Sequence, residues 1–411
     1  MIAARGSERT ERGPLTGLRV VDLTSVVVGP YCTLALADMG ADVIKVESPA
    51  GDTMRDIGPR RNPGMGSQFL SLNRNKRSVV LDLKKPAARE ALSRLVETAD
   101  VFIHNMRRPA IERLGLTYGA IAAVNERIVY CTIHGFHSAG PYRDKAAYDD
   151  TIQGASGLAA IQSRNGEPPR YVVSAIADKT PAMVALSSVL AALLYRERTG
   201  RGQELEVPMF ESMTAYVMSE HLYGKTFEPP LGPTIYSRQV SPFRRPHPTA
   251  DGYICALMYT DEQWDRFFRM ISRAELISDP RFLTIGTRTD NIDELYSIVG
   301  EALRGRSTAD WLSAFEDADI PAMPVNTPDD LLNDKHLRAT DFFYLTEHPT
   351  EGTVRNVRYP ASFSDTPIPL AEPAPTPGQH SHHVLAELGY GEEELKSMVA
   401  AGAINPPASN Q

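Results

Sequence analysis

Short segments rich in β-branched residues alternate with helical segments along the first half of the chain. The segments expected to form strands are residues 18–23, 42–47, 78–83, 100–104 and 127–133. Pro30 stands near the start of an apolar helical stretch that Gly40 closes, and a further helix is expected at 87–98. Strands separated by helices of about ten to fifteen residues form βαβ units and a mostly parallel sheet. The sequence therefore predicts an α/β fold.

The character of the sequence changes near residue 225. Before that point a long helix is expected at 181–198 and a strand at 203–208. Residues 227–249 hold six prolines and follow no clear period, which is typical of a linker or a crossing segment. The elements expected after it are a strand at 253–258, helices at 261–271, 291–303 and 308–318, a strand at 343–347, a Pro-rich connection at 360–377 and a final helix at 381–401. A large and a small part are therefore expected, preceded by a flexible tail at 1–13.

Composition excludes several classes of protein. The 411 residues include 51 acidic and 43 basic ones, so the net charge is −8 and gives no general attraction to nucleic acids or anionic membranes. An anionic ligand therefore needs a local cluster of basic groups. The N-terminus is polar, and the longest apolar stretch, 182–194, is too short to cross a bilayer. Cys32, Cys131 and Cys255 lie too far apart for a disulfide framework, so we expect a cytoplasmic protein.

Three familiar site signatures do not fit the chain. The first turn between strand and helix, residues 26–30 (VVVGP), lacks the GxGxxG pattern of dinucleotide-binding proteins. The string GASG at 154–157 has the wrong spacing for the GxSxG of serine hydrolases. His380, His382 and His383 could hold zinc, but adjacent histidines near a helix start are more often solvated or capping. We therefore predict no metal site.

Asp178 is the most informative acidic residue. An apolar strand is expected to deliver it just before a helix whose first turn is marked by Thr180 and Pro181. Backbone N–H groups and the helix dipole at such a position keep a carboxylate ionised and stabilise negative charge on an attacked carbonyl. An ionised carboxylate held there can act as a nucleophile. The alternative is that Asp178 only caps the helix, and the spacing alone favours capping because Asp is a common N-cap.

Several motifs resemble those of the class III CoA-transferase family, which includes formyl-CoA and carnitine CoA-transferases and the α-methylacyl-CoA racemases. The strings PLTGLRVVDLTSVVVGP and LADMGADVIKVE are similar to the family's N-terminal signature. Further similar strings are NRNKRSVVLDLK (73–84), ERLGL (112–116), GASGL (154–158), RTGRGQ (198–203), DIPAMPVNT (319–327) and GQHSHHVLAELGY (378–390). The resemblance runs from about residue 14 to residue 404, nearly the whole chain.

The resemblance implies a particular architecture. It implies a Rossmann-like parallel-sheet large domain built from both chain ends, 14–224 and 325–411, with a smaller α+β domain at 225–324. It also implies an interlocked homodimer, in which each chain threads its partner. The Pro-rich segments 227–249 and 360–377 are compatible with such crossings.

The resemblance also implies a covalent mechanism in which Asp178 is the nucleophile. Asp178 attacks an acyl-CoA thioester, forms an aspartyl mixed anhydride and then an aspartyl-CoA thioester, and CoA passes to a free carboxylic acid. Coenzyme A enters as the acyl-CoA co-substrate, and no metal or redox cofactor is required. The positions that match the family's CoA contacts are Val26, Val27, Leu81, Lys84, Asn105, Met106, Arg107, Arg113, Tyr148 and Asp149.

Some of these positions leave alternatives open. Val27 stands where some transferases have a glutamine, and its side chain cannot form a hydrogen bond. Tyr148 stands where racemases have an acid/base histidine, and a phenol with an ordinary pKa of about 10 is a poor group for moving an α-proton. A transferase is therefore favoured over a racemase or epimerase, and the third alternative is a CoA-binding protein without catalysis. Tyr148 could also be a buried aromatic residue, and Lys84 or Arg113 a solvated charge.

A basic cluster at the entry to the small domain stands out in this acidic chain. It contains Tyr236, Arg238 and Arg244, together with Arg245 and His247. Arg238 or Arg244 is a candidate for binding the distal carboxylate of a dicarboxylic acyl group, such as succinyl or a methyl-branched C5 diacid, because a guanidinium matches a carboxylate in fork geometry. The alternative, which the sequence alone favours, is a solvated linker or a dimer contact. The glycine-rich loop of some formyl-CoA transferases is absent, which counts against formate and oxalate.

Overall fold

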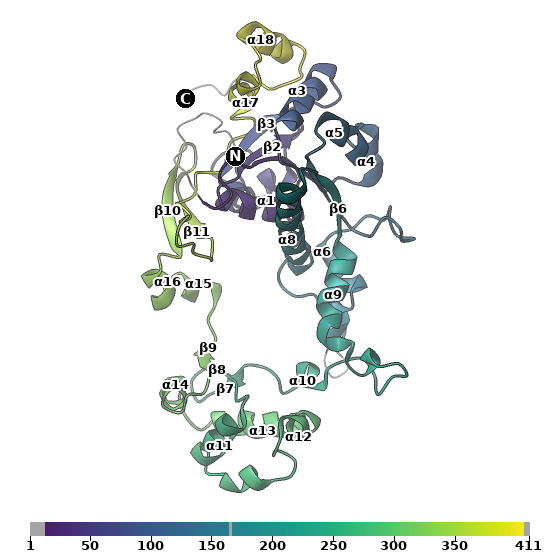
Figure 1. The fold of residues 1–411 in the computed structure, drawn as a ribbon. Coiled ribbons are helices and arrows are strands. Elements are labelled where there is room, and N and C mark those ends of the chain that lie inside the picture. The colour runs from purple at the N-terminus through teal and green to yellow at the C-terminus, as the bar shows by residue number, and fades with distance from the viewer. Residues whose placement is uncertain (1–12, 164–166, 407–411) are drawn as a thin grey trace. The chain divides into compact units, whose positions relative to one another are not determined.

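A six-stranded parallel sheet forms the centre of the larger part of the protein (Figure 1). The computed structural model describes residues 13–163 and 167–406. The strands are β1 (Arg19–Leu23), β2 (Asp42–Glu47), β3 (Lys76–Val80), β4 (Val101–His104), β5 (Val129–His134) and β6 (Gln203–Pro208). Their order is β3-β2-β1-β4-β5-β6, and all neighbours are parallel. This is the Rossmann strand order, so the predicted α/β fold with a Rossmann-like sheet is confirmed.

Helices cover both faces of this sheet, which agrees with the burial of β1 to β5 along nearly their whole length. On one face α1 (Val28–Asp38) lies beside α8 (Ile176–Thr199), and both contact strands of the sheet (Figure 1). On the other face α3 (Pro86–Glu97) and α5 (Tyr118–Val124) share a hydrophobic core with the C-terminal helices α17 (Ser381–Glu387) and α18 (Glu392–Ala400). Both ends of the described chain therefore contribute to one core.

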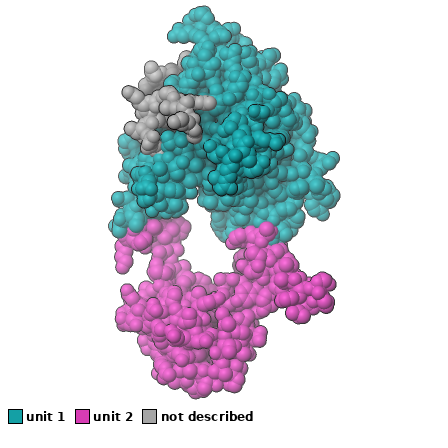
Figure 2. Space-filling model, viewed as in Figure 1, with its two compact units in different colours: residues 1–156, 172–214, 338–411 teal, residues 157–171, 215–337 magenta. Residues whose placement is uncertain are grey.

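The chain divides into two compact units (Figure 2). Unit 1 comprises residues 1–156, 172–214 and 338–411, and unit 2 comprises residues 157–171 and 215–337. The domain boundaries expected from the sequence stay a prediction; they are 14–224 with 325–411 for the large domain and 225–324 for the small domain. The expected tail at 1–13 lies outside the described residues except for Gly13.

Unit 2 has a small α+β core of its own. Its antiparallel sheet consists of β7 (His247–Pro248), β8 (Tyr253–Ala256) and β9 (Ala322–Pro324). The helices around it include α11 (Asp261–Met270), α13 (Ile292–Leu303) and α14 (Thr308–Asp317). Aromatic side chains fill the space between these elements, including Trp264, Phe267, Phe268, Trp311 and Phe315. Such residues bury large apolar areas, which lets a short segment form a core.

Two sequence-based expectations about elements are wrong, and further elements were not expected. The apolar segment expected to lead into Asp178 as a strand, residues 173–177, is not a strand: residues 173–175 are irregular, α8 begins at Ile176, and Pro181 lies inside that helix. The helix expected at 381–401 is two helices, since the chain turns at Gly389, which has a φ of +87°. The helix α9 (Met209–His221) and the strand β11 (Gly352–Val357), which pairs with β10 (Phe343–His348), were not expected.

Among the described residues, α8 has the length and composition of a membrane-spanning helix. This is weak evidence, because buried helices of other proteins share these properties. Half of its most apolar window is buried, and the helix packs against α1 and β5.

A buried ion pair connects β1 with β3. The Lys76 ammonium lies 3.3 Å from the Asp22 carboxylate, and both side chains are completely buried. Lys76 also donates to the Thr33 hydroxyl and the Asn73 side-chain oxygen, at 2.8 and 2.9 Å. Burial lowers the pKa of Lys76 to about 8, although Asp22 opposes the shift. These contacts hold β3, β1, α1 and the end of α2 (Ser67–Asn73) together.

Replacing Lys76 with Met should lower the free energy of unfolding by about 3 kcal/mol, because Asp22 is left buried without this partner. The double variant Asp22→Asn/Lys76→Met should recover part of the loss. Urea and thermal unfolding would measure both, with the exposed Lys85→Met as control. A Lys76→Met protein as stable as the control would show that the pair contributes little.

Candidate active site

A cavity of about 250 Å³ opens in unit 1 where three strands of the parallel sheet end. Ser25–Val28 follow β1, Asn105 and Arg107 follow β4, and His134 ends β5. The strand order reverses between β1 and β4, which is where α/β sheets bind ligands. Six residues singled out from the sequence line this cavity: Val26, Val27, Asn105, Arg107, Tyr148 and Asp178.

Asp178 lies in the first turn of α8, and its side chain does not cap the helix. Instead, the Asp149 carboxylate at the start of α6 (Asp149–Ala155) accepts hydrogen bonds from the N–H groups of Ala177 and Asp178, at 2.7 and 3.1 Å. The Asp178 residue is only 9% exposed, and its carboxylate has no hydrogen bond to any described residue. The capping interpretation of Asp178 is therefore wrong, since Asp149 has that role.

The charge state of Asp178 also differs from the expectation. We expected the helix N-terminus to keep the carboxylate ionised. Burial, with repulsion from Asp149 and Asp150, instead raises the pKa of Asp178 to about 7, and Lys179 offsets only part of this. The N–H groups that would have stabilised the anion are directed at Asp149. The cavity therefore holds a carboxyl group that changes its charge near neutral pH.

The Asn105 side chain bonds the backbone of the loop that follows β1. Its side-chain oxygen accepts from the Ser25 N–H at 2.9 Å, and its side-chain nitrogen donates to the Ser25 carbonyl at 2.8 Å. Because one side-chain amide bonds both the N–H and the carbonyl of Ser25, it restrains the backbone of the loop. Asn105 thus helps to hold the loop that lines the cavity.

Several other predicted positions do not line the cavity. Leu81 is buried and pairs with Ile404 in an isolated β-bridge. Lys84 and Arg113 are exposed, and Met106 is half-buried after β4. The remaining position, Asp149, contacts the backbone of α8 as described above. Tyr148 does line the cavity, but it is 68% exposed, so the alternative of a buried aromatic is wrong for this residue.

The cavity has basic residues that the sequence analysis did not single out. Arg108, His134, Arg143 and Lys145 line it together with Arg107. Arg108 pairs with Glu206 at 3.1 Å, and Arg143 lies in a weak exposed pair with Asp144 at 3.3 Å. Lys145 lies over the Tyr142 ring at 3.8 Å. Two sequence signals could have identified these residues, which we call the basic rim: the adjacent arginines at 107–108 and the string RDK at 143–145.

A second basic pocket, of about 560 Å³, lies within unit 2. Arg238, Arg244, Arg245, His247 and Tyr296 are among its described lining residues, which include no Asp or Glu. The Arg238 Nε donates to the Tyr296 hydroxyl at 2.9 Å, which holds the guanidinium in place. Tyr236 does not line this pocket; its ring stacks on Tyr223. The predicted arginines therefore form part of a pocket that suits an anion.

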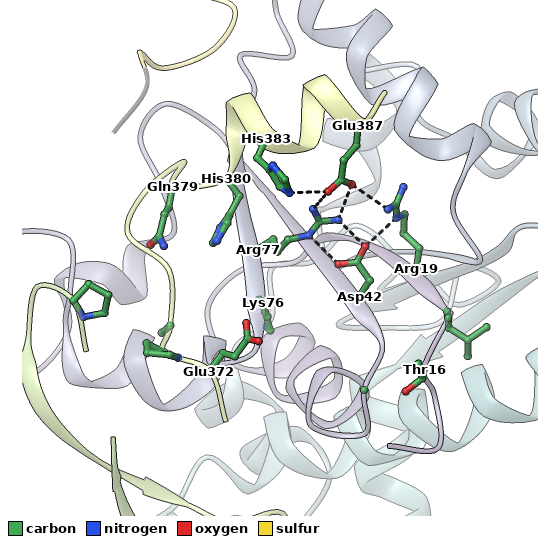
Figure 3. A pocket seen from close by; sticks show the side chains of 16 residues that line it. Thr16, Arg19, Asp42, Lys76, Arg77, Glu372, Gln379, His380, His383 and Glu387 are labelled. Atoms are coloured by element: carbon green, nitrogen blue, oxygen red, sulfur yellow. Dashed lines mark hydrogen bonds and ion pairs between the residues drawn. The ribbon is translucent and has the colours of Figure 1, made fainter. Parts of the chain in front are cut away.

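A third pocket, of about 540 Å³, lies at the amino ends of β1, β2 and β3 (Figure 3). Four of its charged residues pair with one another: Asp42 contacts Arg19 and Arg77 at 3.0 and 2.6 Å, and Glu387 contacts Arg77 at 2.7 Å. His383 contacts Glu387 at 3.1 Å. This network attaches α17 to the sheet. No group of three or more His, Cys, Asp or Glu that could bind a metal ion is present among residues 13–163 and 167–406.

Comparison with known proteins identifies relatives of this chain. The chain is 33% identical to the succinate–glutarate CoA-transferase of Agrobacterium fabrum over 91% of this chain and 96% of that protein. It is 31% identical to the succinyl-CoA:glutarate CoA-transferase of Homo sapiens over 95% of this chain and 90% of that one. A crystal structure of a CAIB/BAIF family protein from Brucella suis superimposes with a TM-score of 0.76 at 30% identity, covering 92% of this chain and all of that one.

The sequence matches the CoA-transferase family III over residues 15–381, nearly the whole chain. Relatives above 30% identity that cover almost all of this chain are named as CoA-transferases. The resemblance identified from the motifs is therefore confirmed, and the chain is an enzyme that belongs to CoA-transferase family III.

Proposed function

We propose that this enzyme moves CoA between an acyl-CoA thioester and a free carboxylic acid, with Asp178 as the nucleophile. The observation that carries the proposal is the Asp178 carboxylate, which is buried beside the cavity and makes no hydrogen bond to a described residue. A carboxylate that is shielded from most of the solvent and unpaired is a stronger nucleophile than an exposed one. The capping by Asp149 keeps α8 intact without engaging the Asp178 oxygens.

The proposed reaction has four steps that balance. The Asp178 carboxylate attacks the thioester carbonyl, the C–S bond breaks, and CoA departs as its thiolate. The product is a mixed anhydride of Asp178 and the acyl group. The thiolate attacks the aspartyl carbonyl and releases the donor acid as its carboxylate, which leaves an aspartyl-CoA thioester. The acceptor carboxylate attacks this thioester and forms a new anhydride with release of thiolate. The thiolate finally attacks the acceptor's carbonyl, which yields the new acyl-CoA and free Asp178.

Each step builds negative charge on a carbonyl oxygen. The N-terminus of α1 lines the same cavity through Val28, and Val27 precedes the helix without capping it through a side chain. Pro30 has no N–H, so Val28 and Gly29 supply the donors at this helix end. We infer that these N–H groups stabilise the oxyanion, because those at the start of α8 already bond Asp149.

Coenzyme A carries phosphates, and the basic rim supplies the local positive charge that an acidic chain needs. Arg107, Arg143 and Lys145 are the groups at this cavity that we assign to CoA, and exposed Lys84 and Arg113 are candidates for its more distant phosphates. Val26, Val27 and Tyr148 would contact CoA through apolar and aromatic surface. Neither Leu81 nor Met106 lines the cavity, so for these two residues a contact with CoA rests on the family resemblance alone.

We also propose a dicarboxylic substrate. Relatives named for succinate, glutarate, citramalate and mesaconate support this. The pocket in unit 2, with three arginines and no acidic lining residue, would bind the distal carboxylate through Arg238 or Arg244. An interlocked homodimer is part of the same proposal. The exposed apolar face of α8, which includes Met183, Val184 and Leu194, supports a partner chain at that face.

Replacing Asp178 with Ala should lower CoA transfer from succinyl-CoA to glutarate at least about 10³-fold, because the covalent route loses its nucleophile. Wild-type enzyme turning over in hydroxylamine should give a hydroxamate at residue 178 by peptide mass spectrometry. Enzyme with hydroxylamine but no acyl-CoA is the control. CoA binding without transfer or hydroxamate would favour a binding protein, and deuterium entering the α-position without an acceptor acid would favour a racemase.

The pH profile should report the charge of Asp178. Because only the ionised form attacks, kcat/KM should rise with pH through about 7 and level off above it. The change Asp149→Asn removes a repelling charge while its amide oxygen can still accept the α8 N–H groups, so the pKa of Asp178 should fall and the acid limb should move to lower pH. The exposed Glu90→Gln on α3 should keep the wild-type limb. An unmoved limb in Asp149→Asn would contradict this assignment.

The arginine pocket should discriminate between acyl donors. Arg238→Ala or Arg244→Ala should raise KM for succinyl-CoA about 10- to 100-fold, since a charged hydrogen bond is lost, and should leave acetyl-CoA nearly unchanged. Arg238→Lys keeps the positive charge but loses the two parallel hydrogen bonds of the guanidinium. Its KM for succinyl-CoA should therefore lie between those of the wild type and Arg238→Ala. Equal changes for both donors would assign the cluster to the linker or to a dimer contact.

A further inference from the structure

Val26 has an unusual backbone conformation in the loop that lines the cavity. Its φ is +68°, in the left-handed region that a β-branched residue rarely adopts. Such a conformation is energetically unfavourable for a β-branched residue and persists only where the surroundings impose it. Val26 and its neighbours Val27 and Val28 all line the cavity that contains Asp178. The strain therefore lies within the candidate active site.

Side chains from four places in the fold hold this loop. Asp22 at the end of β1 accepts from the Thr24 N–H at 2.8 Å, and Lys45 on β2 donates to the Thr24 carbonyl at 2.8 Å. Asn105 holds both polar groups of Ser25, as described above. Asp52 accepts from the Val26 N–H at 3.2 Å. The backbone of residues 24–26 is thus held by side chains rather than by secondary structure.

Lys45 and Asp52 form the buried part of this arrangement. Their ion pair measures 2.9 Å, and each side chain is 1% exposed. Asp52 also accepts from the Met54 N–H at 3.0 Å, so its carboxylate has a charged partner and two backbone donors. Burial disfavours the charged amine, but Asp22, Asp52 and Glu47 raise the pKa of Lys45 above its ordinary value. Neither side chain lines the cavity, so neither can touch a substrate there.

The loop is also packed tightly against the start of α1. A Cβ added to Gly29 would lie 2.2 Å from the Thr24 Cβ, which real structures do not allow. Movement of residues 24–26 would therefore shift the first turn of α1. This couples Asp52 to the N–H groups of Val28 and Gly29 at the end of the helix that lines the cavity.

We propose that Lys45 and Asp52 are positioning residues, which hold Val26 in its left-handed conformation and so direct the N-terminus of α1 at the reacting carbonyl. This inference rests on the proposed function, because the oxyanion is that of the Asp178 reaction. The pair acts through backbone geometry alone. Its loss changes the turnover of bound substrate more than the binding of substrate.

The first test compares kcat with KM. Asp52→Ala should lower kcat for CoA transfer about 10- to 100-fold and change KM for acyl-CoA less than about threefold. Asp52→Asn keeps the size of the side chain and an acceptor for the Val26 N–H, so it should fold and retain more of kcat. Asp38→Asn is the matched control, because Asp38 and Arg74 form another buried pair, at 2.5 Å, away from the loop. It should lower stability without lowering kcat of the folded enzyme.

The second test asks whether the effect passes through Val26. Glycine adopts a φ of +68° without strain, so Asp52→Ala should cost less than about threefold in kcat when combined with Val26→Gly. Val27 has an ordinary φ of −121°, and Val27→Gly should not reduce the cost of Asp52→Ala. If Asp52→Ala lowers kcat by the same factor in the wild-type and Val26→Gly backgrounds, the proposal is overturned.

Hydrogen exchange supplies a readout that does not depend on activity. Asp52→Ala and Asp52→Asn should speed exchange in a peptide covering 24–31, whereas Asp38→Asn should leave that peptide unchanged. Unchanged exchange there in both Asp52 variants would overturn the positioning role even in an active enzyme. If the wild-type protein transfers no CoA, the proposed function fails, and the exchange result still decides whether the pair holds the loop.

Discussion

The contact between the Asp149 carboxylate and the first N–H groups of α8 determines the character of the candidate active site. Because Asp149 caps the helix, Asp178 can lie in the first turn with its own oxygens unengaged. The same contact places a negative charge beside Asp178, and with burial this raises the pKa of Asp178 to about 7. One carboxylate thus provides helix stability, and the other is kept available for chemistry.

The site combines two opposite electrostatic arrangements. Beneath the loop after β1, the charges of Asp22, Lys45 and Asp52 are buried and paired, so they give rigidity. Around the cavity, Arg107, Arg143 and Lys145 lie nearer the surface and suit the phosphates of CoA. A chain with a net charge of −8 can bind a polyanion only through such local placement. In the reaction we propose, the buried set aligns backbone donors and the outer set binds the substrate.

The ease of predicting each element depended on the range of the interactions that define it. The parallel strands were predictable because β-branched runs between helices are a local signal, and their bounds differ by only a few residues from those observed. The start of α8 was not predictable, because its first turn is capped by the Asp149 carboxylate, which lies 28 residues before Ala177 in the sequence. The division of the last helix followed from Gly389, a local signal that the sequence analysis missed. Asn105 could be associated with the site through the family resemblance, but its bonds to Ser25 required the fold.

The sequence by itself determined the fold class and the family and singled out Asp178 as a candidate nucleophile, since these rest on patterns and motifs that are contiguous in the chain. The tertiary structure alone decided the environment of Asp178 and the strained conformation of Val26. Both depend on burial and on contacts among β1, β2, β4, α6 and α8, which are distant in the sequence. A carboxylate's charge and a loop's conformation are properties of the surroundings, and only folding assembles those surroundings.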